Sequence, residues 1–158
     1  MDDLVRWLAE QLAEDERIAR ATLWDDDGAL GSGGWYSYDR GPRDGFREAR
    51  WVVIDRADEG VMDSRPQAAD DQAVAQHIAE WDPARVLREI DAKRQLVKLH
   101  GRAVLRAGGG AQYFATATVC RSCEPDHQFP ELSWPCPTLR LLALPYADRP
   151  GYKESWRP

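Results

Sequence analysis

The sequence lacks a long apolar run. None of its hydrophobic stretches approaches the roughly 20 residues that cross a membrane as a helix. It also starts Met-Asp-Asp, without the basic segment and following apolar segment that mark a secretory leader. We therefore expect a cytoplasmic protein that makes no membrane contact.

Cysteine is scarce, with three residues in a chain of 158. An odd number of cysteines in a compartment that keeps thiols reduced makes a disulfide framework a poor explanation. The cysteines are left with three roles, which are metal binding, redox chemistry and plain burial.

No catalytic constellation is visible. No spacing of Ser, His and Asp suggests nucleophilic catalysis, and the Gly-Ser-Gly-Gly run at 31–34 lacks the Lys-Ser/Thr of a phosphate-binding loop. Many acidic residues are spread along the predicted helices, where solvation explains them. The sequence therefore names no catalytic residue, and we expect a protein without enzymatic activity.

The patterns that are present predict a single α+β domain. Helical periodicity recurs near both ends and in the middle, with short aromatic and β-branched runs between. We expect a small antiparallel sheet packed with N-terminal, central and C-terminal helices, and a zinc knuckle near the C-terminus. The expected segments are an N-terminal helix at 1–24, a β-meander at 35–64, central helices at 70–106, and the knuckle with the C-terminal helix at 113–158.

The central helix is the best-marked element. Asp82 before Pro83 is typical of a helix start, because Asp caps free N–H groups and proline lacks one. Gly101 is a natural stop just after His100. The pattern also allows a frayed continuation of the helix to Arg106.

Three cysteines and a histidine form the candidate metal site. Cys120 and Cys123 make a Cys-x-x-Cys turn, which lets two thiolates share one ion, and Cys136 follows at a helix start. A tetrahedral site needs a fourth ligand, for which His100 is the first choice and His127 the second. Four protein ligands leave no open position, so the zinc would be structural.

The same cysteines allow two other interpretations. One is that they are buried thiols without metal, and the other is that Cys120 and Cys123 form a redox-active pair. The redox reading lacks the βαβ setting that such pairs favour.

A basic stripe is the best candidate binding surface. It consists of Arg88, Arg94, Lys98, Arg102 and Arg106, placed along the far side of the central helix. The net charge of −6 argues against nucleic-acid binding by the whole surface but leaves room for such a patch. Three interpretations of the stripe remain open. It is a solvated helix face, a surface that contacts nucleic-acid phosphates, or a surface that binds an acidic protein.

Two segments carry a resemblance to a known family. The runs HIAEWDPARVLREIDAKR and WPCPTLRLLALPYADRPGYKESWRP resemble an uncharacterised actinobacterial and phage-associated family of unknown function, distantly similar to Ea22-like phage accessory proteins. In that family a histidine often ends the equivalent helix, so the resemblance favours His100 as the ligand. It implies a shared architecture, and it gives no information about activity.

Taken together, these patterns predict a non-enzymatic binding or regulatory protein stabilised by structural zinc. An unknown protein is the expected partner. The alternatives are a nucleic-acid-binding accessory protein of phage or mobile-element origin, which would use the basic stripe, and a thiol oxidoreductase acting through Cys-x-x-Cys.

Overall fold

The computed structural model describes residues 2–23, 34–41, 51–56, 58, 60–63, 70–107, 115–123 and 134–158. In chain order, its main elements are α1 (Asp3–Ala21), β1 (Trp35–Asp39), β2 (Trp51–Asp55), β3 (Gly60–Asp63), α2 (Asp71–Glu80), α3 (Pro83–Leu99), β4 (Arg102–Ala107), β5 (Ala115–Cys120) and α4 (Pro137–Ala143). Two short 3₁₀ turns follow, η1 (Leu144–Tyr146) and η2 (Glu154–Trp156).

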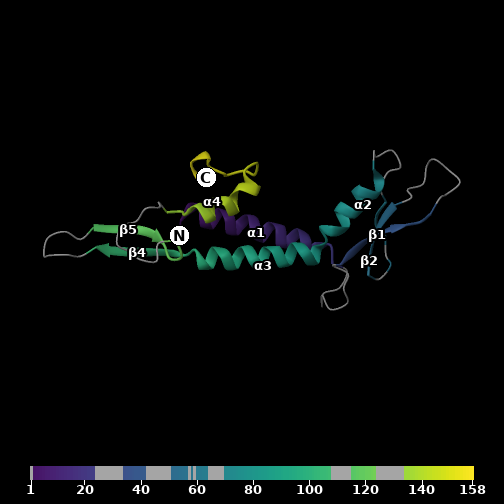
Figure 1. Ribbon diagram of the computed structural model, residues 1–158, viewed down its shortest axis with the longest axis horizontal. Coiled ribbons are helices and arrows are strands. Elements are labelled where there is room, and N and C mark those ends of the chain that lie inside the picture. The colour runs from purple at the N-terminus through teal and green to yellow at the C-terminus, as the bar shows by residue number, and fades with distance from the viewer. Residues whose placement is uncertain are drawn as a thin grey trace. The chain divides into compact units, whose positions relative to one another are not determined.

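The predicted α+β class is confirmed (Figure 1). β1, β2 and β3 form one antiparallel sheet in that order, and β4 pairs with β5 in a second. The chain divides into two compact units, with boundaries inside α1 and α3. We call Met1–Glu14 with Asp91–Pro158 the terminal unit, and Asp15–Ile90 the sheet unit. The expectation that the whole chain is a single domain stays a prediction.

The sheet unit is built on the packing of α2 against β1 and β2. Its buried centre joins Val53 of β2 to Ala75 and Ala79 of α2. The two alanines are four residues apart and therefore share one helix face. Their small side chains let the helix approach the sheet closely, while Trp35 and Ile78 pack around them.

The starts of α2 and α3 follow from local sequence. Asp70 caps α2, because its Oδ1 accepts a hydrogen bond from the backbone N–H of Ala73 at 2.9 Å. Asp82 caps α3 in the same way by accepting from the N–H of Arg85. Pro83 is the first residue of α3, as the Asp-Pro pair predicts.

The end of the central helix corrects one expectation. α3 stops at Leu99, and β4 begins at Arg102. The predicted helical span of 70–106 is therefore wrong beyond His100, and Arg102 and Arg106 lie on a strand, away from the helical stripe expected for them. The β4–β5 ladder satisfies the backbone hydrogen bonds of this segment, which overrides the helical propensity of its residues.

An aromatic cluster ties the C-terminal segment to α1 in the terminal unit. The ring of Trp7 lies 5.6 Å from that of Tyr152 and 5.4 Å from that of Trp156, between centroids. Trp7 Nε1 also donates a hydrogen bond to the carbonyl of Pro150 at 2.9 Å. Gly151 has a φ of +87°, and a Cβ there would lie 3.0 Å from Trp7 Nε1. Both the backbone conformation and the close approach therefore require glycine.

Two polar pairs surround this cluster. Lys153 Nζ lies 3.0 Å from Asp3 Oδ2, and an Arg149 guanidinium nitrogen lies 3.4 Å from Gln11 Oε1. The Lys153–Asp3 pair is exposed, and exposed ion pairs contribute little free energy. The stability of the terminal unit at this point comes from burial of the rings.

Within the described part of the chain, no helix combines the length and the apolar character that a membrane span requires.

We predict that Trp7→Ala lowers the free energy of unfolding by about 3–5 kcal/mol, because it removes a buried indole and a hydrogen bond. Trp7→Phe keeps most of the ring contact and should cost less. Urea denaturation measures both, with Trp81→Ala as the control, since Trp81 is 46% exposed. Equal losses for Trp7→Ala and Trp81→Ala would contradict the role given to the cluster.

Candidate metal centre

Four potential ligands come from separate points of the terminal unit. His100 directly follows α3, and Cys120 is the last residue of β5. Cys123 lies in the turn after β5, and Cys136 is the N-cap residue of α4. The site therefore joins the end of a helix, a two-stranded ribbon and the start of a second helix.

The strand pairing places the cysteine turn beside the histidine. Arg102 faces Cys120 in the β4–β5 register, so Cys120 lies opposite a residue two positions after His100. The backbone N–H of Arg121 donates to the carbonyl of Gly101 at 2.9 Å. Ser122 Oγ donates to the carbonyl of Leu99 at 2.6 Å. These bonds fix the Cys-x-x-Cys turn on the helix end.

The four ligand atoms converge. His100 Nδ1 lies 3.4 Å from Cys120 Sγ, 3.4 Å from Cys123 Sγ and 3.6 Å from Cys136 Sγ. All four atoms lie within 4.8 Å of one another. A tetrahedral ion with metal–sulfur bonds of about 2.3 Å and a metal–nitrogen bond of about 2.05 Å would separate sulfur from nitrogen by about 3.6 Å. The cluster has the size and the donor atoms to hold one metal ion.

The position of Cys136 is fixed by burial and by hydrogen bonds from Arg140 to its surroundings. It is fully buried, as is Leu139 one turn further along α4. Arg140 Nε donates to the carbonyl of Pro135 at 2.9 Å, and another nitrogen of the same guanidinium lies 3.3 Å from the carbonyl of Ser155. One arginine therefore links the residue before Cys136 to the C-terminal turn η2.

The thiols differ in their pKa. Burial raises the pKa of Cys120, but backbone N–H groups of Cys123 and Ser122 donate to its sulfur and leave the pKa below the ordinary value of 9.0. Burial, together with the neighbouring thiols, raises the pKa of Cys123 to about 12. Burial also raises the pKa of Cys136. Without a cation these crowded sulfurs resist becoming thiolates together, and a bound cation would reverse that preference.

The sequence-predicted residues divide into two groups. The cluster contains the expected Cys120, Cys123 and Cys136, and its histidine is His100, the first choice. His127, the second choice, lies outside the described residues.

The residues of the basic stripe are not part of this cluster. Arg88, Arg94 and Lys98 are exposed on α3, and Arg102 is exposed on β4. Arg106 also belongs to β4. Their role in binding stays a prediction.

Sequence reasoning missed the supporting residues Ser122 and Arg140. Ser122 lies between the two cysteines of the turn, a position that gives a short hydroxyl access to a neighbouring backbone carbonyl. That position is a usable signal. Arg140 offers none, because its acceptors at Pro135 and Ser155 are brought together by the fold alone.

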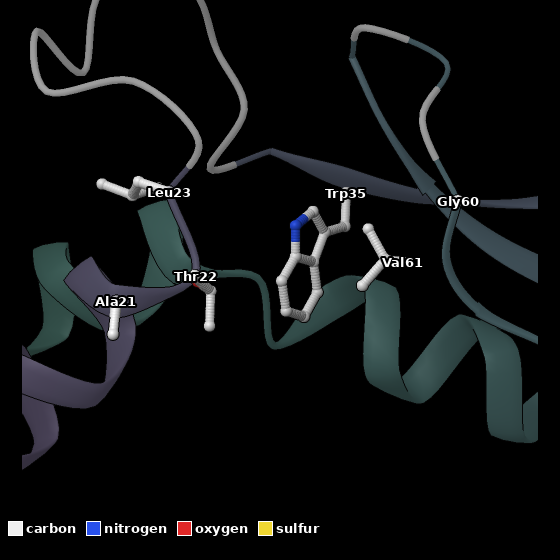
Figure 2. Close-up of a pocket in the computed structure, with 6 residues that line it drawn as sticks. All are labelled: Ala21, Thr22, Leu23, Trp35, Gly60 and Val61. Carbon is white, nitrogen blue, oxygen red and sulfur yellow. The ribbon is translucent and has the colours of Figure 1, made fainter.

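The sheet unit contains a separate pocket of about 330 Å³. Figure 2 shows the indole ring of Trp35 between Thr22 and Val61, with Ala21, Leu23 and Gly60 completing the lining. Thr22 Oγ1 already donates to the carbonyl of Ala19 at 2.8 Å. Among these described lining residues there is no acid, base or thiol, so the pocket supplies no catalytic group.

Comparison with known families adds one finding. A family model described as a family of unknown function, DUF6221, matches residues 1–158. The chain belongs to the DUF6221 family. No curated protein and no solved structure matches it. Membership of DUF6221 agrees with the resemblance to a family of unknown function, whereas an actinobacterial or phage origin stays a prediction.

We predict that this DUF6221 protein binds a single Co²⁺ ion. The bound ion should show the charge-transfer absorption that thiolate sulfur gives with cobalt. Cys120→Ser, Cys123→Ser and Cys136→Ser should each keep at most about two thirds of that intensity, because two thiolates remain. His100→Ala should weaken binding while the sulfur bands persist. His77→Ala and His127→Ala are the controls, and a loss of binding in either would refute the ligand set.

We also predict that metal binding at neutral pH releases at least the protons of Cys123 and Cys136, since the raised pKa of each keeps the free thiol protonated. Metal affinity should therefore rise with pH and fall as acid protonates the ligands. Titration calorimetry in buffers of different ionisation enthalpy measures the released protons. An affinity independent of pH would contradict thiolate ligation.

Proposed function

We propose that the protein is a non-enzymatic binding protein whose terminal unit is stabilised by a structural zinc ion. The convergence of Cys120, Cys123, Cys136 and His100 Nδ1 carries this proposal. Three thiolates and one imidazole suit zinc, because soft sulfur donors and tetrahedral geometry select it over hard cations. Carboxylates, which magnesium and calcium prefer, are absent from this set of four.

A structural role is favoured over a catalytic one. Catalytic zinc keeps one position for water or substrate, whereas four protein ligands would complete the tetrahedron of an ion bound here. Cys120 and Cys136 are 2% and 0% exposed, so a substrate cannot approach their sulfurs directly. The thiol oxidoreductase alternative would use Cys120 and Cys123. Cys120 is buried, and Cys123 is half-buried with its pKa raised to about 12, so neither thiol combines access with a low pKa.

Zinc binding would stabilise α4 and the β4–β5 ribbon, which are too small to be stable by themselves. α4 has 7 residues, and β4 pairs with β5 alone among the described strands. Helices this short and isolated two-stranded ribbons are marginal in water. An ion bound to residues of both would order them together, because binding energy at a site that forms on folding is also folding energy.

We predict stoichiometric zinc by elemental analysis of the purified protein and a lower melting temperature after chelation. Adding zinc back should restore the original melting temperature. His77→Ala should behave as the unchanged protein in both states, because His77 lies outside the cluster. Sub-stoichiometric zinc, or a melt that a chelator leaves unchanged, would overturn the proposal.

A further inference from the structure

A cationic segment without acids contains three of the four candidate metal ligands. Residues 92–123 contain six lysines and arginines and no Asp or Glu, in a chain that has 27 acidic residues and a net charge of −6. The segment covers the second half of α3, the β4–β5 ribbon and the Cys-x-x-Cys turn. Charge is therefore segregated along this chain, and one part of the terminal unit is strongly basic.

Three of these cations come from neighbouring backbone positions at the base of the ribbon. Lys98 is in the last turn of α3, Arg102 begins β4, and Arg121 follows β5. The Arg121 backbone bonds to Gly101, the neighbour of Arg102. All three are exposed. Arg102 donates to Thr118 Oγ1 at 3.2 Å, and no carboxylate of the described residues forms an ion pair with any of the three.

Uncharged groups near these cations are of the kinds that contact a nucleic acid. Leu99 and Val104 are 60% and 54% exposed, and Val104 lies opposite Thr118 in the ribbon. The hydroxyl residues Thr118 and Ser122 lie next to the cations. Arg, Lys, Ser and Thr are the side chains that contact phosphate oxygens, and aliphatic groups contact the thymine methyl.

The shape of the ribbon favours duplex DNA over an acidic protein. β4 and β5 lie side by side beyond the end of α3 and pair with no further strand among the described residues (Figure 1). A two-stranded ribbon is one of the elements that fit the major groove, which is about 12 Å wide. We infer that the β4–β5 ribbon and its adjoining turn, through Lys98, Arg102 and Arg121, bind the backbone of double-stranded DNA.

This inference rests on the proposed function, since the zinc ion would hold the ribbon and the turn in one arrangement. It identifies the partner of the proposed binding protein as a polyanion that carries phosphate groups. Repulsion by the rest of this acidic chain would keep contact confined to the basic segment. The expected binding is therefore local, weak in sequence preference and steeply dependent on salt.

The test uses the zinc-loaded full chain and a fluorescein-labelled duplex of mixed sequence. Fluorescence anisotropy from about 50 to 200 mM salt gives the affinity and its salt dependence. The triple variant Lys98→Gln, Arg102→Gln, Arg121→Gln should bind at least about tenfold more weakly at low salt, with the slope of log affinity against log salt reduced by about three. Its zinc content and melt should stay unchanged, because it keeps all four ligands.

The matched control removes the same charge elsewhere. Arg6, Arg20 and Arg157 are exposed and pair with Asp3, Glu16 and Glu154. Arg6→Gln, Arg20→Gln, Arg157→Gln should bind DNA as the unchanged protein does. No DNA binding at low salt, equal loss in both triple variants, or equally tight binding to polyglutamate would overturn the inference. Normal zinc content in such a case would leave the proposed function standing.

Discussion

The meeting of three sulfurs and one imidazole nitrogen within 4.8 Å is the interaction on which the terminal unit depends. The start of the short helix α4, the base of the β4–β5 ribbon and the end of α3 meet at this point. Three thiolates crowded together would repel one another, and a bound cation would replace that repulsion with attraction.

Further contacts connect the metal centre to the rest of the terminal unit. Arg140 bonds to the carbonyls of Pro135 and Ser155, which connects the Cys136 segment to η2. Trp156 in η2 then packs on Trp7 of α1. The metal centre, the C-terminal segment and the first turns of α1 are therefore connected by one continuous series of contacts.

The sequence predicted the class of fold and the start of α3, because both follow from local patterns such as Asp82-Pro83. It also predicted the cysteines of the cluster, since Cys-x-x-Cys is itself a local geometry. It missed β4. Arg102–Ala107 contains good helix formers, and its strand conformation arises from pairing with β5, a long-range contact that no local pattern encodes. The choice between His100 and His127 stayed open in the sequence for the same reason, because the β4–β5 register brings Cys120 to the end of α3.

The central claim is that one zinc ion has three sulfur ligands and one nitrogen ligand in this protein. X-ray absorption at the zinc edge of the purified protein tests it most directly. We predict three sulfur ligands at about 2.3 Å from the zinc and one nitrogen ligand at about 2.0–2.1 Å. Ligation dominated by oxygen, or a fourth sulfur in place of the nitrogen, would contradict this claim.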